Sequence, residues 1–432
     1  MKISNKKIYL NQKQELKDLN MIKNNMKLKL AEIKLSDNNL LDNERRLIQF
    51  NKRIRKNWIK NVGISNSFVY KSTLWGTDVK DLQGYKYHFS YETLLNDENS
   101  FADLMGYSIK EMNNKTFLFS SGMSAITSIL YCLSSFIKGS LDIQVSAGYF
   151  ETKYFFKLLN SMGNKVVFDL ESSTSTNVFY FEPIKYDATL SVTDPKKLID
   201  SINASNANLK IIIMDSTMSN QTRIFNILKD KIKNIENTIF IDIRSGLKLD
   251  EEGLELSNLG IATVFVSKSN ENLFKIFKNY IEQYKGLTGT NISFYSLCLS
   301  HYFQELNAKE YVCKVKKQII WAVKNLNIKN SKKIKKIIWK KVNYYGDTLI
   351  SPFIFLELYN NNEKNYLDTI NTLQNLMKNK GLNLDYRNSW GFRMPSIEYF
   401  NDIFTQKKYI KYYPGSFKGL TAVEAINSIN RL

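Results

Sequence analysis

Short apolar runs rich in β-forming residues alternate with segments of helical hydrophobic spacing between about residues 115 and 270. Runs this short and this continuously apolar are typical of strands buried on both faces, joined by helices that return the chain to the same edge of the sheet. The pattern therefore predicts an α/β fold with a mainly parallel sheet covered by helices. The five runs are Gln144 to Ser146, Lys165 to Phe168, Ile211 to Met214, Thr238 to Ile241 and Ala262 to Val266.

The segments on either side of this region differ in texture. Residues 1–60 contain neither Gly nor Pro and are rich in Lys, Asn, Leu and Ile, which predicts a helical N-terminal arm. After about residue 300 the pattern is helix-rich, with one strand candidate at Ile350 to Leu358. We therefore expect an arm over 1–60, a large α/β domain over 61–300 and a small C-terminal α+β domain over 301–432. The arm either wraps a neighbouring subunit or is a solvated helical extension.

The charge of the chain first suggests an anionic partner. Its 61 Lys and Arg residues exceed its 41 Asp and Glu residues, which gives a net charge of +20. Only nine of the 61 are arginines, although nucleic-acid binders rely on Arg for bidentate contacts, and the lysines are scattered over the whole chain. The dense stretch Lys329 to Lys341 is interleaved with apolar residues, which indicates an amphipathic element with a lysine face. We therefore expect a solvated basic surface and no nucleic-acid partner.

Other classes of protein are disfavoured on composition. No stretch of about eighteen uninterrupted apolar residues is present, and the first residues lack the apolar region of a secretion signal, so we expect a cytoplasmic chain outside the membrane. The three cysteines, Cys132, Cys298 and Cys313, are far apart, and His88 and His301 are the only histidines. Neither a disulfide framework nor a metal site is therefore expected.

Polar residues directly after the apolar runs are candidates for a site, because ligands gather at the carboxyl ends of parallel strands. Asp215 and Ser216 follow one run, with Ser219 and Asn220 just beyond. Asp242 follows the next run, and Ser267 and Lys268 follow the last. An acid and a lysine at the ends of two successive strands form either a functional pair or a structural salt bridge.

Two further segments are candidates for ligand contacts. The apolar spacing after Ser121 predicts a helix that begins there and ends before Gly139. Its free N–H groups at the positive end of the helix dipole suit a phosphate, although Ser is also simply a good N-cap. Tyr149 follows the run that ends at Ser146, where it is either a rim residue or a ring that lies against a planar ligand.

In this order, the segments resemble the pyridoxal-phosphate-dependent enzymes of cysteine and methionine metabolism, the group of cystathionine γ-synthase, cystathionine lyase and methionine γ-lyase. The resemblance spans roughly residues 100–425 and rests on the collinearity of the motifs rather than on any one of them. The chain is similar to a divergent member of this group. The matching segments are Ser121-Gly122-Met123-Ser124-Ala125-Ile126, Tyr149-Phe150-Glu151-Thr152, Ser219-Asn220, Asp242, Ser267-Lys268, Thr288 to Ser293, Gly346 to Ser351, Ser389-Trp390-Gly391 and Lys411 to Gly415.

The resemblance implies the aspartate-aminotransferase-like fold (fold type I), with a large, mainly parallel sheet of seven strands, and pyridoxal 5′-phosphate as cofactor. It implies that Lys268 forms the Schiff base and shuttles protons, that Asp242 pairs with the pyridine N–H, and that Tyr149 stacks on the ring. The phosphate would be held by Ser121, Gly122, Met123 and Ser267, and the phenolic oxygen by Asn220.

The substrate-binding positions depart from the family pattern. The resemblance places the substrate carboxylate at Ser389 and at the family's arginine position, where this chain has Lys411, with Arg393 as a compensating cation. The loop after Lys268 is also altered, and the family's motif for a neighbouring subunit's phosphate has only a weak counterpart around Tyr85 and Lys86. These departures indicate an unusual substrate.

The resemblance implies a lyase or transferase that acts through an external aldimine and a Cα carbanion. We expect β- or γ-elimination, or γ-replacement, on a cysteine-, homoserine- or methionine-like amino acid, in a homodimer or tetramer. The open alternatives are an aminotransferase-type reaction on the same fold and a catalytically silent subunit that serves binding or assembly.

Overall fold

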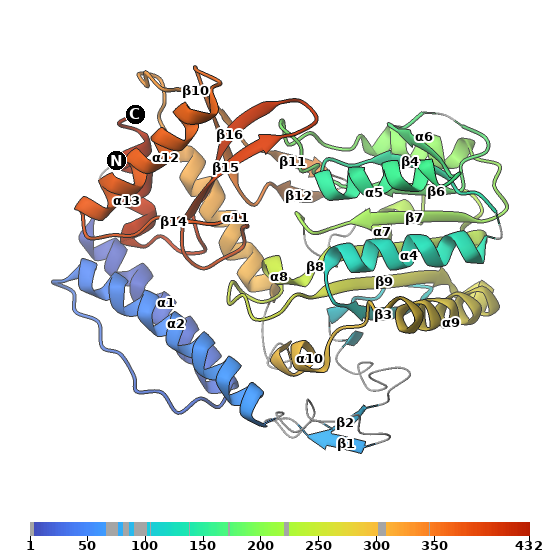
Figure 1. Cartoon of the computed structure of the whole chain (residues 1–432), viewed down its shortest axis with the longest axis horizontal. Helices are drawn as coiled ribbons and strands as arrows, with labels where there is room; N and C mark the ends of the chain where they lie inside the picture. Colours follow the sequence, from blue (N-terminus) through green and yellow to red (C-terminus); the bar gives the residue numbers. More distant parts are fainter. Residues whose placement is uncertain are drawn as a thin grey trace.

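The computed structural model describes residues 4–65, 77–80, 86–89, 102–103, 105–137, 139–171, 173–219, 224–300, 308–344 and 346–432. Two sheets dominate these residues, and a pair of long N-terminal helices runs along one side of the molecule (Figure 1). None of the described helices combines the length and the apolar character that a membrane span requires. A short hairpin of β1 (Thr77–Lys80) and β2 (Lys86–Phe89) lies apart from both sheets.

The large sheet has seven strands in the order β3-β9-β8-β7-β6-β4-β5. Strands β4 to β8 pair in parallel with their sheet neighbours, whereas β9 is antiparallel to both β8 and β3. The last strand before the helix-rich region therefore runs against the others. The strands are β3 (Met112–Phe119), β4 (Asp142–Ser146), β5 (Lys165–Phe168), β6 (Val178–Phe181), β7 (Lys210–Asp215), β8 (Thr238–Ser245) and β9 (Gly260–Ser267).

The predicted α/β class and the mainly parallel sheet are confirmed, and all five apolar runs are strands. The sequence analysis missed β3 and β6, and it placed the end of β8 four residues too early. The alternating side chains of β8 carry Asp242 and Arg244 inside the strand, so its polar residues did not mark its end. These differences matter for the site, because they change which residues stand at the carboxyl edge.

Helices cover both faces of the large sheet. One face packs against α4 (Gly122–Phe136), α5 (Phe150–Ser161) and α9 (Glu271–Thr288) in a core built from the odd-numbered residues of β7 and β8. The other face packs against α6 (Pro195–Ala204) and α7 (Ile224–Leu228). The short helices η2 (Ile235–Asn237), α8 (Gly246–Leu249), η3 (Lys268–Asn270) and α10 (Phe294–Ser300) stand at or near the strand ends.

The C-terminal part forms a five-stranded sheet in the order β10-β13-β16-β15-β14, packed against α11 (Ala308–Asn325), α12 (Glu363–Asn379) and α13 (Leu420–Ile429). The predicted strand over 350–358 is interrupted at Ser351, so that it belongs partly to a hairpin and partly to the sheet. The remaining strands are β10 (Ile334–Ile338), β11 (Lys341–Tyr344), β12 (Asp347–Ile350), β13 (Ile354–Leu358), β14 (Asp385–Tyr386), β15 (Ser396–Asp402) and β16 (Lys407–Tyr413).

The N-terminal arm is helical, as predicted, and consists of α1 (Asn5–Asn25) and α2 (Leu40–Ser65). It is not a solvated extension, because it packs on its own chain along α13 and α10 (Figure 1). Glu44 accepts hydrogen bonds from two backbone N–H groups at the start of α13, and the buried Trp58 donates to the carbonyl of Leu299. These long-range contacts make the arm part of the folded core.

Candidate active site

A cavity of about 500 Å³ opens at the carboxyl ends of the parallel strands, between the large sheet and the C-terminal sheet. Ligands of open α/β sheets collect at this edge. The side of the large sheet contributes the start of α4 and the ends of β6, β7 and β8, while loop and sheet residues of the C-terminal part close the other side. The polar residues of its lining are Ser121, Tyr149, Glu151, Glu182, Tyr186, Asp215, Thr217, Arg244, Ser245, Lys248, Asn258, Asn388, Ser389, Glu398 and Lys411.

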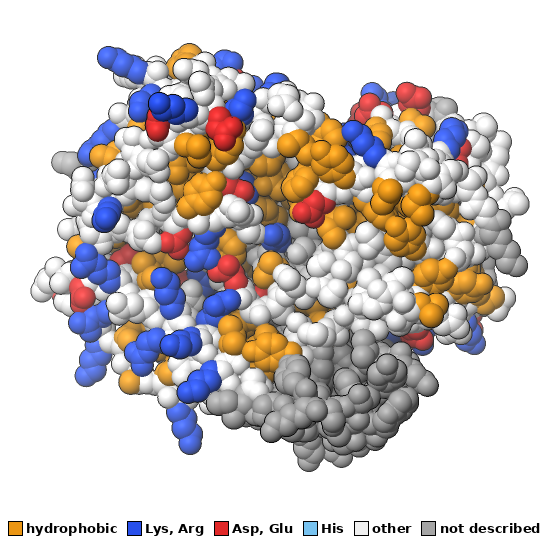
Figure 2. Space-filling view, viewed as in Figure 1, with side chains coloured by type: hydrophobic (Ala, Val, Ile, Leu, Met, Phe, Trp, Pro, Cys, Tyr) orange, Lys and Arg blue, Asp and Glu red, His pale blue; other side chains and the backbone are white. Residues whose placement is uncertain are grey.

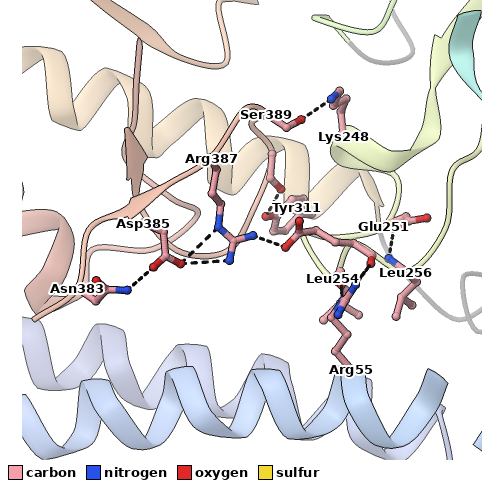
Figure 3. Close-up of polar contacts among 12 residues, drawn as sticks. Arg55, Lys248, Glu251, Leu254, Leu256, Tyr311, Asn383, Asp385, Arg387 and Ser389 are labelled. Carbon is pink, nitrogen blue, oxygen red and sulfur yellow. Dashed lines mark hydrogen bonds and ion pairs between the residues drawn. The ribbon is translucent and has the colours of Figure 1, made fainter. Parts of the chain in front are cut away.

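Lys248 brings a primary amine to this cavity. It stands on α8, the single helical turn that follows β8, and its ammonium group donates to the hydroxyl of Ser389 (Figure 3). Burial is the main cause that lowers the pKa of Lys248 to about 8, and the positive charge of Lys411 adds to the effect. A lysine with a lowered pKa carries a larger neutral fraction, which is the form that attacks a carbonyl carbon.

Lys268 lies elsewhere, which corrects the site expected from the sequence. It follows β9, and because β9 is antiparallel to its neighbours, its end meets the first residue of β3 and the beginning of β8. Lys268 and Ser267 therefore lie at the amino edge of the parallel strands, outside the cavity, and the Lys268 side chain is exposed. The expected Ser267-Lys268 anchor thus has no contact with the other candidates.

Two buried carboxyl groups form the floor of the cavity. Asp215 is the last residue of β7 and accepts hydrogen bonds from the Tyr180 hydroxyl at 3.1 Å and from the Thr217 N–H at 2.9 Å. Glu182 follows the neighbouring strand β6. Burial raises the pKa of both groups, and the nearby charge of Asp215 helps to raise the pKa of Glu182 to about 7. Glu182 can therefore hold a proton near neutrality.

Asp242 does not line the cavity. It pairs with Met214 in the sheet, one position deeper than Asp215, and it is fully buried near Tyr107 and Arg244. Burial raises the pKa of Asp242 to about 6, against the opposing effect of the Arg244 charge. The predicted contact of Asp242 with a ligand ring is therefore replaced by a structural role within the core, and Asp215 is the acid at the strand end.

The start of α4 lies beside Ser245 and lines the cavity. Ser121 caps this helix as predicted, with its hydroxyl accepting from the Ser124 N–H at 3.0 Å. A Cβ at Gly122 would come within 3.1 Å of the Ser245 Cβ, so the helix start and the end of β8 are in close approach. The first N–H groups of a helix have no acceptor within it, and they suit a phosphate. Ser121, Gly122 and Met123 thus reach the cavity as expected, with Ser245 in the place foreseen for Ser267.

Tyr149 reaches the cavity as expected, at the N-cap of α5. Its ring is parallel to that of Tyr186, with an interplanar angle of 5° and a centroid distance of 5.8 Å. Both residues are held by Glu182, which accepts the N–H of Tyr149 at 3.1 Å and that of Tyr186 at 2.9 Å. Glu182 also accepts the N–H of Gly148 at 3.0 Å, so one carboxylate fixes two loops and the aromatic pair that they carry.

Three residues were expected at the substrate carboxylate, and the structure brings two of them to the cavity. Ser389 contacts Lys248, and Lys411 lies on β16 with its ammonium group against Glu398 and 3.0 Å from the Tyr186 hydroxyl. Arg393 is buried outside the cavity, where its guanidinium donates to the Glu15 carboxylate of α1 at 2.6 Å and 3.0 Å. It anchors the arm and is not available to a substrate.

The structure does not test the other predicted site residues. Asn220 and Tyr85 lie outside the described residues, and Lys86 is described only as the first residue of β2. The sequence analysis missed Lys248, Glu182, Thr217, Ser245 and Glu398 as site residues. Knowledge of the true end of β8 would have found Ser245 and Lys248, because Ser245 is the last residue of the strand and Lys248 lies on the helical turn that follows it.

Metal-ligand residues do not cluster within the described part of the chain: no group of three or more His, Cys, Asp or Glu side chains there is arranged to hold an ion. Cys132, Cys298 and Cys313 form no disulfide; the first two are buried and Cys313 is exposed.

No protein-family model matches the chain, and no curated protein matches its sequence. Solved structures do match. MetB from Corynebacterium glutamicum is 13% identical with a TM-score of 0.56, over 84% of this chain and 92% of that one. A cystathionine gamma synthase from Xanthomonas oryzae pv. oryzae, solved with aminoacrylate and cysteine, is 11% identical with a TM-score of 0.56, over 86% and 96%.

A third match is CalE6, a methionine gamma lyase from Micromonospora echinospora, which is 12% identical with a TM-score of 0.51, over 74% of this chain and 82% of that one. Matches at such low identity show a shared fold only, and the chemistry must be argued from the residues of the site. The expected fold is thereby confirmed, since the chain has the fold of the type I pyridoxal-phosphate-dependent enzymes.

Proposed function

We propose that the chain is a pyridoxal-phosphate-dependent enzyme whose cofactor is anchored at Lys248. The observation that carries this proposal is an amine with a lowered pKa in one cavity with a buried strand-end acid and the N-terminus of α4. Amine, acid and phosphate cradle are the three contacts that this cofactor needs. The anchor proposed here replaces Lys268, which stands at the opposite edge of the sheet.

The residues of the cavity fit the parts of the cofactor. The α4 N–H groups at Gly122 and Met123, with the Ser121 and Ser245 hydroxyls, would hold the phosphate. Asp215 would hold the pyridine N–H, because a buried carboxylate is stabilised by a positive charge placed next to it. Tyr149 would cover the ring. Pyridoxal phosphate supplies an electron sink that stabilises a carbanion at the Cα of a bound amine.

The protein groups then determine the fate of the substrate. The Lys248 amine would be the base that takes the Cα proton of the bound substrate, a task suited to a pKa near the working pH. We propose elimination or replacement at the β or γ carbon of a cysteine-, homoserine- or methionine-like substrate. The support for this class is the shared fold with MetB, the methionine gamma lyase and the cystathionine gamma synthase.

The test of the anchor is covalent trapping. The protein is incubated with pyridoxal phosphate and reduced with borohydride, and the modified peptide is identified by mass spectrometry. We expect the adduct on Lys248. Lys248→Ala should lose the adduct and the yellow colour, whereas Lys268→Ala, the matched control, should keep both, because its side chain is exposed and distant from the cavity.

The outcomes separate the alternatives. An adduct on Lys268 would contradict the anchor, and a protein that ignores added cofactor would contradict the proposed function. A trapped adduct without turnover of cysteine, cystathionine or homoserine esters would favour a silent binding or assembly subunit. Keto-acid formation with consumption of an amino donor would favour transamination, because the same amine and acid serve that reaction.

A further inference from the structure

The cation expected to receive the substrate carboxylate already has a carboxylate. Lys411 on β16 and Glu398 on β15 stand directly opposite each other across the antiparallel pair, and their side chains form an ion pair that lines the cavity. The pair is largely shielded, with 3% of the Lys411 side chain and 13% of the Glu398 side chain exposed. The Tyr186 hydroxyl accepts a further hydrogen bond from Lys411 at 3.0 Å.

Three described arginines near the cavity also have carboxylate partners. Arg244 pairs with Asp250 at 3.1 Å, with 1% of each side chain exposed, and its Nη2 also donates to a backbone carbonyl. Its buried Nη1 has no hydrogen-bond partner among the described residues, but the charge of the guanidinium is balanced by Asp250. Arg387 bridges Asp385 and Glu255 outside the cavity (Figure 3). Arg393 is held by Glu15 of the arm. Among the described residues that line the cavity, Lys248 alone is a cation without a carboxylate partner in an ion pair, and the proposed function assigns it to the cofactor.

A free α-carboxylate would meet an unfavourable environment here. To reach Lys411 it must approach Glu398, and two carboxylates that share one lysine in a shielded site repel each other. To replace Glu398 it must leave that residue buried without its partner, which costs as much as breaking a buried ion pair. Glu398 therefore acts against substrates that carry a negative charge at this point.

An uncharged group fits the same surroundings. The wall beside the pair is aromatic: the Tyr186 ring stacks on Phe400 with a centroid distance of 5.4 Å and an interplanar angle of 15°, and Trp390 and Phe400 also line the cavity. Such a wall takes up an amide, an ester or a hydrocarbon chain without the loss of a charge's hydration.

We propose that Glu398 selects an amine substrate whose carboxyl group is masked as an amide or ester, or is absent. The inference rests on the proposed function and names the substrate class of the same site. Glu398 is a specificity-determining residue in this proposal: it holds Lys411 in an ion pair and thereby fills the position that a substrate carboxylate would take.

The test is a matched ligand series on the cofactor-loaded protein, with methionine, methionine amide and 3-(methylthio)propylamine as probes. Apparent dissociation constants come from the change in cofactor absorption and, independently, from calorimetry. The wild type should bind the amide and the amine roughly tenfold or more tightly than methionine. Glu398→Gln frees Lys411, so it should gain affinity for methionine by a similar factor while its affinity for the uncharged probes changes little.

The control is Glu357→Gln, which removes a carboxylate from an ion pair with Lys335 in the same sheet, outside the cavity, and should leave the ratio of affinities unchanged. The inference would be overturned if the wild type bound methionine more tightly than methionine amide, or if it bound none of the probes. It would also be overturned if Glu398→Gln kept the wild-type ratio of affinities for the amide and for methionine. If the variant does not fold, the wild-type comparison decides alone. If no cofactor adduct is trapped, the proposed function is overturned instead. Calorimetry with the same probes then still measures whether the protein prefers the uncharged ones to methionine.

Discussion

The backbone of Gly260 lies directly against the carbonyl group of Ser121: a Cβ at residue 260 would come within 2.0 Å of that oxygen and 3.0 Å of the Gly122 nitrogen. Gly260 is the first residue of the antiparallel β9, whereas Lys268 follows its last residue. The strand that carries Lys268 away from the cavity therefore begins at the phosphate cradle that we propose at the start of α4. A close approach of two backbone segments tolerates only glycine.

We therefore predict that Gly260→Ala damages the cradle. The new methyl group must push the Ser121 backbone away, and overpacking of this kind costs about 1–3 kcal/mol. We expect weaker binding of pyridoxal phosphate, by roughly tenfold or more, together with a lower unfolding midpoint. Absorption titration and urea denaturation measure the two effects. Gly139→Ala is the control, because a Cβ there meets nothing within 4 Å; equal effects of both changes would refute the prediction.

The pKa of Lys248 gives a second prediction, on pH. Because burial and Lys411 lower this pKa to about 8, the amine becomes neutral, and hence nucleophilic, as the pH rises through that value. The initial rate of adduct formation with pyridoxal phosphate should therefore increase with pH, with a midpoint near 8. Lys411→Met removes a positive neighbour and leaves Glu398, whose charge raises the Lys248 pKa, so the midpoint should move upward.

The control for this pH profile is Lys268→Ala, which should keep the wild-type midpoint because Lys268 is exposed at the other edge of the sheet. A midpoint that Lys411→Met leaves unchanged would mean that the two ammonium groups do not interact. Trapping with borohydride at each pH, followed by quantification of the modified peptide, gives the required rates.

The sequence predicted the fold class because the apolar runs and the helical spacing are local signals, and the start of α4 at Ser121 was readable from its cap and its periodicity. The direction of β9 was not readable. Antiparallel pairing depends on contacts across the sheet, so Ser267 and Lys268 resembled a strand-end motif although they stand at the opposite edge. The ion pairs of Arg393 and Lys411 are likewise long-range contacts.

Arg393 shows how such a contact changes a functional assignment. From its position near Ser389, the sequence suggested a substrate contact, but Glu15, almost four hundred residues away, holds its guanidinium. We predict that Arg393→Met destabilises the protein by about 3–5 kcal/mol, because it leaves the carboxylate of Glu15 buried without a partner. The exposed pair of Arg46 and Asp42 provides the control, and Arg46→Met should cost less than about 1 kcal/mol.

Urea denaturation of both variants measures this difference. Arg393 links the arm to the loop at Glu252, because its guanidinium binds Glu15 of the arm and also donates to the backbone carbonyl of Glu252 at 3.2 Å. The Arg393→Met variant should therefore also expose the arm to limited proteolysis in native buffer. Equal midpoints for the two variants, or an arm that stays protected, would show that the arm is held by its apolar contacts alone.

A last prediction concerns the pH dependence of stability. Burial raises the pKa of Glu251 to about 7, although the carboxylate accepts the Ser257 N–H at 2.9 Å and the Leu256 N–H at 2.5 Å (Figure 3). The folded state therefore keeps a proton that the unfolded state releases near pH 4.5. The contribution of Glu251 to the free energy of unfolding is therefore fully present below pH 4.5 and is lost as the pH rises through 7.

Between pH 4.5 and 7.5, the free energy of unfolding of the wild type should therefore fall by about 3 kcal/mol relative to that of Glu251→Gln, whose amide does not titrate. Glu32→Gln changes an exposed position and should follow the wild type at every pH. Charged side chains are spread over the described part of the face in Figure 2, so the loss of one surface charge changes little. The measurement is the free energy of unfolding in urea at steps across this range. Parallel curves for the wild type and Glu251→Gln would show that Glu251 is ionised in the folded protein throughout, with its three donors outweighing its burial.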